Sequence, residues 1–158
     1  MKRLKNLLAA IVWAGAATCS ANDFVPLDRA AATAIADPAS HARPTIVALW
    51  SSECVHCKKN LKLFAEMAKV HPRLQLITVA VEPADEGLAA PLDRVGVTGK
   101  RFAYGDESPE ALAYALDGKW RGELPRTLLF DGRGGKVALS GVVSEAAVRD
   151  SLGLVARQ

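Results

Sequence analysis

Two cysteines three residues apart, Cys54 and Cys57, are the side chains of this sequence whose type and spacing best fit a chemical role. A helix is predicted to begin at this point, and unpaired backbone N–H groups at a helix start favour an anion. We therefore expect the pKa of the Cys54 thiol to be depressed, since thiols in such settings have pKa values of about 3.5 to 7.5. The pattern predicts Cys54 as the attacking thiol and the more buried Cys57 as the resolving thiol.

Three other uses of such a pair fit the sequence less well. A structural disulfide gains little by closing so short a loop. A zinc site needs four ligands, and His41, His56 and His71 do not have the spacing of metal ligands. Covalent haem attachment requires histidine directly after the second cysteine, where the sequence has Lys58. Thiol–disulfide exchange remains the main interpretation, and it requires no bound cofactor and no metal.

The first 21 residues have the order of segments that is typical of a secretory signal peptide. Basic side chains at Lys2, Arg3 and Lys5 precede an apolar stretch over 7–17, and small or polar residues follow. Cleavage after Ala21 predicts a periplasmic or otherwise extracytoplasmic protein, in a compartment where disulfides can form.

Cys19 allows a second interpretation of this leader, as the lipid-bearing cysteine of a bacterial lipoprotein. Thr18 directly before it is a poor match to the small residue that such signals usually have. An anchored form is therefore the less favoured alternative to a free exported chain.

Length and charge exclude several classes of protein. The 158 residues, half of them hydrophobic and 23% charged, suit one folded domain rather than a disordered chain. No uncharged apolar run reaches the roughly 18 residues that indicate a bilayer-spanning helix. The leader holds three of the 20 basic side chains and none of the 17 acidic ones, so the mature chain is formally neutral. We therefore expect no nucleic-acid partner.

The mature chain is predicted to alternate between strands and helices. A helical extension over 22–43 precedes a domain over 44–158, and apolar runs over 45–50 and 74–81 are typical of buried strands. The expected helices lie at 28–36, from Cys57 to about His71, near 88–95, from Pro109 to a close at Gly118, and from Ser144 to Gly153; the other strands lie near Phe102, at 127–130 and at 136–142. This order predicts an α/β mixed sheet with helices on both faces.

Three features in this order resemble the thioredoxin superfamily, in particular its exported TlpA-like branch. They are the strand ending at Trp50 before the cysteine pair, the segment 122–130, and the glycine turn over 131–135. The resemblance implies a thioredoxin-like fold and a thiol:disulfide oxidoreductase acting on protein thiols or disulfides, including a membrane or periplasmic redox partner. It also implies a monomer.

The resemblance assigns further residues to the substrate site. Pro125 takes the place of the cis-proline of the family, and Leu124 offers its backbone to the substrate. Independently of the resemblance, we expect Trp50 to form a wall of the pocket rather than to react. The residues alone favour a trans bond before Pro125, because trans is the common state of X-Pro bonds.

The sequence departs from the family where the proton of the resolving cysteine is concerned. Many thioredoxins have a buried acid where this chain has Ala48, and TlpA-like proteins often have an acid where it has Asn60. We expect the proton acceptor for Cys57 to come from elsewhere, with Glu82 and Asp85 as candidates.

Charged neighbours leave the direction of electron flow open. His56 favours the Cys54 thiolate, which would make the disulfide more oxidising. Glu53 opposes this effect, whereas Lys58 and Lys59 add to it. Two other classes of function stay open at this point: a non-catalytic binding module on the thioredoxin scaffold, and a metallochaperone that uses the same cysteine pair.

Overall fold

The computed structural model describes residues 24–154. The predicted signal peptide, its cleavage after Ala21 and the candidate lipid site at Cys19 lie outside these residues. Within them, no helix combines the length and the apolar character needed to cross a bilayer. The elements in chain order are β1 (Val25–Leu27), α1 (Arg29–Ala36), a 3-10 turn (Pro38–Ser40), β2 (Thr45–Trp50), α2 (Val55–Val70), β3 (Gln75–Ala80), α3 (Ala90–Val95), β4 (Lys100–Tyr104), α4 (Pro109–Leu116), β5 (Arg126–Phe130), β6 (Lys136–Ser140) and α5 (Glu145–Leu152).

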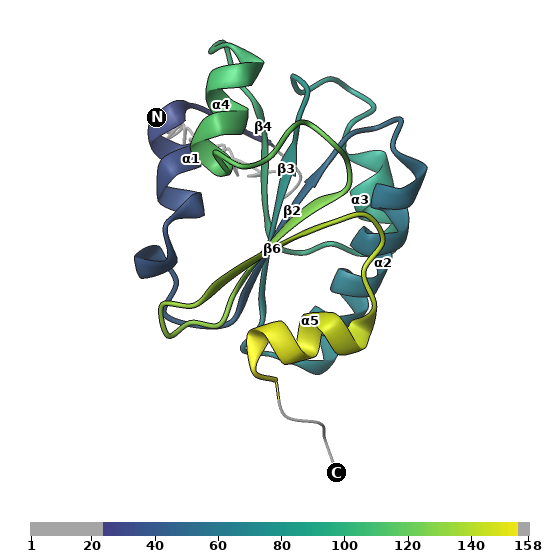
Figure 1. Cartoon of the computed structure of the whole chain (residues 1–158). Coiled ribbons are helices and arrows are strands. Elements are labelled where there is room, and N and C mark those ends of the chain that lie inside the picture. The colour runs from purple at the N-terminus through teal and green to yellow at the C-terminus, as the bar shows by residue number, and fades with distance from the viewer. Residues whose placement is uncertain (1–23, 155–158) are drawn as a thin grey trace, which may run out of the picture.

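One mixed sheet organises the molecule, in the strand order β1-β4-β3-β2-β5-β6. The strands β1, β4, β3 and β2 are parallel, and β5 and β6 are antiparallel to their neighbours. Helices α1 and α4 cover one face, and α2, α3 and α5 cover the other (Figure 1). The predicted mixed sheet with helices on both faces is confirmed.

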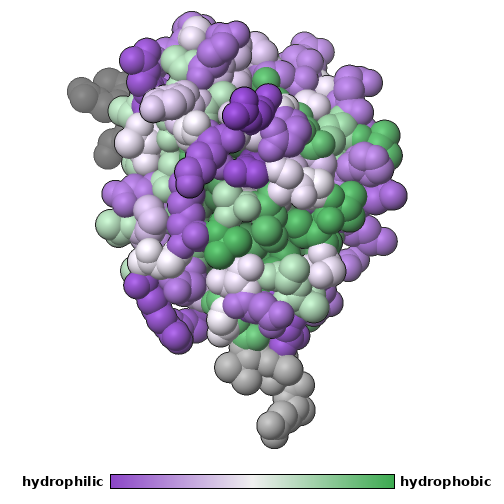
Figure 2. All heavy atoms as spheres, in the orientation of Figure 1, coloured by the Kyte–Doolittle hydropathy of each residue, from purple (hydrophilic) through white to green (hydrophobic). Residues whose placement is uncertain are grey.

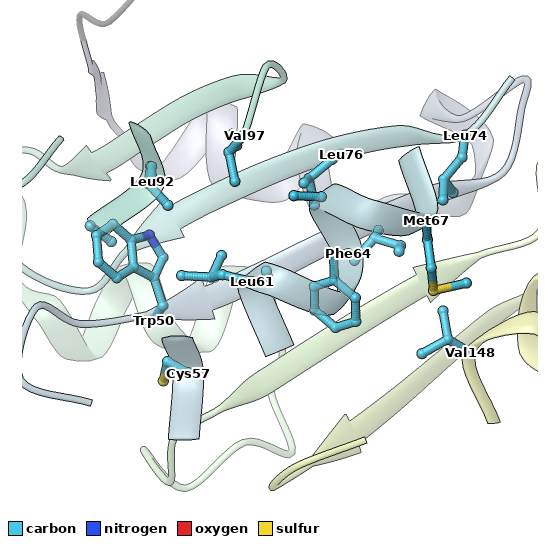
Figure 3. Close-up of a cluster of buried hydrophobic side chains, with 14 of the residues drawn as sticks. Trp50, Cys57, Leu61, Phe64, Met67, Leu74, Leu76, Leu92, Val97 and Val148 are labelled. Carbon is cyan, nitrogen blue, oxygen red and sulfur yellow. The ribbon is translucent and has the colours of Figure 1, made fainter. Parts of the chain in front are cut away.

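The core divides into two layers because successive residues of a strand point to opposite faces. Val47 and Leu49 of β2 pack toward α1 and α4, whereas Ile46 and Trp50 pack toward α2. Figure 3 shows the α2 layer, in which Leu61 and Phe64 of the helix lie among residues of the sheet, α3 and α5. Central strand β2 is buried along its whole length, which explains its continuous apolar run.

Residues before the predicted domain take part in the same sheet. Strand β1, which the sequence analysis does not predict, pairs in parallel with β4, and Leu27 is fully buried. Helix α1 packs on α4, and its N-cap Asp28 accepts a hydrogen bond from the Ala31 N–H at 2.7 Å. Residues 24–43 therefore share sheet and core with the rest of the fold.

Side-chain caps fix where the later helices begin. Ser108 caps α4 and Ser144 caps α5, each through a hydrogen bond to the N–H three residues on, as the sequence predicts. The predicted close of α4 at Gly118 is wrong by one residue, because the C-cap is Asp117 in an extended conformation. A left-handed glycine does end α5, at Gly153.

Candidate active site

Cys54 is the N-cap of α2, directly beyond the carboxyl end of β2. Its sulfur accepts a hydrogen bond from the backbone N–H of Cys57 at 3.1 Å, and its carbonyl accepts one from the Lys58 N–H. The first turn of α2 carries no acidic side chain. The positive end of a 16-residue helix therefore acts on the Cys54 sulfur without an opposing carboxylate in that turn.

The two cysteines form a disulfide, and their burial differs. The sulfur atoms are 2.03 Å apart and the Cα atoms 5.2 Å apart. Cys57 is 1% exposed and lies in the core layer under α2, whereas Cys54 is partly exposed at the start of the helix. A protein partner can therefore approach Cys54, while Cys57 is shielded.

His56 and the charged neighbours of Cys54 lie at the surface. The side chains of Glu53, His56 and Lys59 are exposed and that of Lys58 is partly buried. These groups sit in high dielectric, where a single charge acts weakly on its neighbours. The backbone dipoles of α2 therefore supply the part of the electrostatic field at Cys54 that has a fixed direction.

Glu82 and Asp85 follow β3, and only Glu82 reaches the loop before Cys54. The Glu82 carboxylate accepts hydrogen bonds from both the backbone N–H and the hydroxyl of Ser52. Asp85 is exposed and accepts a bond from the Gly87 N–H in its own loop. The structure thus brings one of the two candidate acids to the cysteine loop and leaves the other in a surface turn.

Pro125 and Leu124 lie at the entrance to β5. The Leu124–Pro125 peptide bond is cis, Pro125 is buried, and Leu124 is partly exposed. The Pro125 carbonyl accepts a hydrogen bond from the Gly141 N–H at 2.9 Å. This bond joins the proline to the loop between β6 and α5.

Asn60 fastens that same loop to α2, one turn beyond Cys57. Its amide nitrogen donates to the Gly141 carbonyl at 3.0 Å, and its amide oxygen accepts from the Val143 N–H at 3.2 Å. Asn60 is 2% exposed, so both bonds are shielded from water. In the sequence, Asn60 is notable only as the absence of an acid; a polar residue on the buried face of α2 is the signal that indicates this contact.

An apolar surface lies over β6 and the β6–α5 loop. Figure 2 shows hydrophobic atoms gathered on this face, with hydrophilic atoms around them. Val142 in the loop is 54% exposed, and Val55, next to Cys54, is 65% exposed. Leu124 and Val143 are partly exposed. Exposed apolar groups beside a reactive sulfur are suited to contact with another protein.

The structure corrects the expectation for Trp50. The sequence analysis places this indole in the wall of the substrate pocket, but its side chain is 0% exposed. Figure 3 shows Trp50 beside Leu61 and Leu92 in the layer beneath α2. Because even-numbered residues of β2 point toward α2, Trp50 packs under the redox loop rather than facing a partner.

A buried ion pair holds the segment before Pro125. Arg126 donates hydrogen bonds from two of its nitrogens to one Asp117 oxygen, and both side chains are nearly buried. Another Arg126 nitrogen donates to Ser140, whose hydroxyl donates to Glu123 at 2.6 Å. The network connects the end of α4 to β5 and β6. The segment that carries Leu124 is therefore held at both of its ends.

The position six residues before Cys54 holds no proton acceptor. Ala48 is buried, and its partners in the sheet are Thr78 of β3 and Thr127 of β5. Within residues 24–154, neither threonine hydroxyl has a hydrogen-bond partner. Among the described residues, this row of the sheet therefore contains no carboxylate or imidazole beside the cysteine pair.

Solved structures with similar folds are thiol–disulfide proteins. A secreted disulfide oxidoreductase from Mycobacterium tuberculosis aligns over 73% of this chain and 84% of its own, with TM-score 0.57 and 13% identity. A putative thioredoxin from Neisseria meningitidis aligns over 72% and 74%, with TM-score 0.55 and 14% identity. A secreted thiol-disulfide isomerase from Corynebacterium glutamicum aligns over 71% and 70%, with TM-score 0.55 and 16% identity.

No family model matches the chain, and no curated protein matches it. At these identities the structural likeness concerns the backbone. The chain has the thioredoxin-like fold, as its sequence predicts.

The Asp117–Arg126 ion pair should make the free energy of unfolding depend on pH in the acid range. Burial alone would raise the pKa of Asp117, but the hydrogen bonds and charge of Arg126 outweigh burial and the pKa is lowered. The folded carboxyl thus has a lower pKa than the unfolded one. Its stabilisation is complete above about pH 4, where the unfolded carboxyl is ionised, and it is lost as pH falls through the lower folded value.

Asp117→Asn is therefore expected to lower the free energy of unfolding at pH 7 by about 2 kcal/mol, because Arg126 loses its buried partner. Urea denaturation measured from pH 7 down to pH 3 should show the gap to the wild type closing below pH 4. Asp106→Asn, at an exposed position, should stay within about 0.5 kcal/mol. A gap for Asp117→Asn that is constant over this range would contradict the assignment.

Proposed function

We propose that this chain is an exported thiol:disulfide oxidoreductase that exchanges disulfides with protein substrates through Cys54 and Cys57. The observation that carries the proposal is a disulfide at the first turn of α2 with one accessible sulfur and one buried sulfur. This asymmetry separates the roles of the two cysteines, because a partner disulfide must meet an exposed attacking sulfur. Export rests on the leader over 1–21.

In the reducing direction, the Cys54 thiolate attacks one sulfur of a partner disulfide. A mixed disulfide forms, the partner's S–S bond breaks, and the leaving thiolate takes up a proton. Cys57 then loses its proton and attacks the Cys54 sulfur, which forms the intramolecular disulfide and releases the partner's second thiolate. Two electrons pass from the Cys54–Cys57 dithiol to the partner, and no bound cofactor is needed.

In the oxidising direction the steps run in reverse. A substrate thiolate attacks Cys54 of the disulfide, the Cys54–Cys57 bond breaks, and Cys57 leaves as the thiolate and takes up a proton. A second substrate thiolate then attacks the substrate sulfur of the mixed disulfide, which forms the substrate disulfide and releases the Cys54 thiolate, so two electrons pass from the substrate to the Cys54–Cys57 pair. The backbone N–H of Cys57 and the dipole of α2 stabilise negative charge on Cys54 in both directions. His56, when charged, adds to that stabilisation and favours oxidation of the partner.

Glu82 acts in this proposal as the proton acceptor and donor for Cys57. Its carboxylate lies against Ser52, two residues before Cys54, and it is partly shielded from water. Asp85 has no such role, because it is exposed and its carboxylate contacts its own loop rather than the loop before Cys54.

Protein partners contact the redox site at the apolar surface over β6 and the β6–α5 loop. Leu124 offers its backbone to an extended segment of the substrate, and the exposed side chains of Val55 and Val142 provide apolar contact. Because the chain before Pro125 is anchored through Arg126, the site loses little conformational entropy when a substrate segment binds. The partner is another protein's thiol or disulfide, of the periplasm or the membrane surface.

Cys57→Ala is expected to trap partners as mixed disulfides through Cys54. The variant retains the attacking thiol but lacks the resolving one, so the first adduct accumulates. Non-reducing electrophoresis of extracts, with mass spectrometry of the adducts, measures the trapping. The matched control is the double variant Cys54→Ala with Cys57→Ala. Adducts that are equally abundant in the control, or absent from both, would refute exchange through Cys54.

Glu82→Gln is expected to slow the release of a mixed disulfide about a hundredfold, the usual scale of a lost acid–base group. Attack by Cys54 on the substrate should change little. Rapid mixing with a fluorescent peptide disulfide separates the two steps. Asp85→Asn is the matched control and should behave as the wild type. Equal effects of the two substitutions would remove Glu82 from the mechanism.

A further inference from the structure

A cavity of about 460 Å³ opens at the same end of the sheet as Cys54, beside α4. Its walls come from Val81 after β3, Tyr104 at the end of β4, the first turns of α4, and the loop 120–122. Figure 1 shows the α4–β5 loop crossing this end of the sheet toward β5. The cavity lies on the α4 face of the sheet.

Aromatic rings dominate the lining. Tyr104, Tyr114 and Trp120 contribute rings, and Val81 and Ala113 add aliphatic groups. Tyr114 is 75% exposed, so its ring is available to a ligand at the mouth of the cavity. Such a lining favours an occupant that buries an apolar, ring-shaped group, because ring pairs gain from edge and face contacts.

The electrostatics of the cavity favour an uncharged occupant. Burial raises the pKa of Tyr104 to about 12, so this wall stays neutral at physiological pH. Glu110 and Arg121 line the cavity with opposite charges, so neither sign of ligand is selected. The Tyr104 hydroxyl is buried and, within residues 24–154, has no hydrogen-bond partner.

The wall formed by Trp120 is held in place before any ligand arrives. Its indole N–H donates to the Glu123 carbonyl at 2.7 Å, and its backbone N–H donates to the Asp117 carbonyl at 2.9 Å. Asp117 is itself fixed by Arg126. A preformed wall lowers the entropic cost of binding.

Two segments of chain connect the walls of the cavity to the redox site. Gly122 lies two residues before Leu124, a span of at most about 7 Å. Val81 donates its N–H to the Trp50 carbonyl and directly precedes Glu82, which holds Ser52. A substrate segment lying along Leu124 would therefore reach the cavity within a few residues.

We propose that this cavity binds an aromatic side chain of the protein substrate, on the same segment as the cysteine that exchanges with Cys54. The inference rests on the proposed function and adds a substrate preference to it. Tryptophan or tyrosine near the reactive cysteine would hold the partner while the mixed disulfide forms. The preference should appear as a higher kcat/KM for substrates with such a residue.

The test compares peptide disulfides in which a single tryptophan is moved residue by residue along a Gly/Ser chain, on each side of the cysteine. In the wild type, one or two positions should exchange about tenfold faster than the peptide without tryptophan. Ala113→Trp fills the cavity from α4 and should abolish this gain. Ala34→Trp, on an exposed position of α1 outside the cavity, is the matched control and should keep it.

Exchange with dithiothreitol separates this inference from the proposed function. The small dithiol has no side chain to place in the cavity, so the wild type and both tryptophan variants should react with it at the same rate. No gain at any tryptophan position, a gain that survives Ala113→Trp, or a larger gain with lysine in place of tryptophan would overturn the aromatic site. Loss of the dithiothreitol reaction in the wild type would instead overturn the proposed function.

Discussion

The start of α2 at Cys54 is the constraint on which the rest of the site depends. A helix leaves its first N–H groups without partners inside the helix, and here one of them, that of Cys57, points at the Cys54 sulfur. The sulfur thus serves as the helix cap, a role that oxygen side chains usually fill. The same bond that begins the helix also favours negative charge on the Cys54 sulfur. Strand β2 and the buried face of α2 then fix where this cap lies in the molecule.

The second half of the site is assembled by contacts between segments that are distant in the sequence. Asn60 of α2 holds the loop at Gly141 and Val143, and Gly141 in turn binds the carbonyl of Pro125. Arg126 joins the other end of the proline segment to Asp117. The helix that carries the cysteines and the segment around Pro125 are therefore parts of one hydrogen-bonded frame.

Local signals in the sequence were sufficient for most of the elements. The bounds of β2 and the caps at Ser108 and Ser144 follow from runs of apolar residues and from single side chains that act within one turn. Strand β1 gives too weak a signal, because it has three residues and includes a proline. The burial of Trp50 and the bonds of Asn60 depend on which face of the sheet meets α2, which only the assembled fold determines. The cis bond before Pro125 follows from the family resemblance, since the residues alone favour trans.

The pH dependence of alkylation of Cys54 in the reduced protein tests most directly whether the start of α2 stabilises the thiolate. Iodoacetamide modification is followed by mass spectrometry, so that Cys54 and Cys57 are distinguished, and the urea-unfolded chain serves as the reference. If the helix start stabilises the thiolate, Cys54 should react with an apparent pKa at or below about 7.5 when folded and revert to about 8.5 when unfolded. The same apparent pKa in both states would contradict the account.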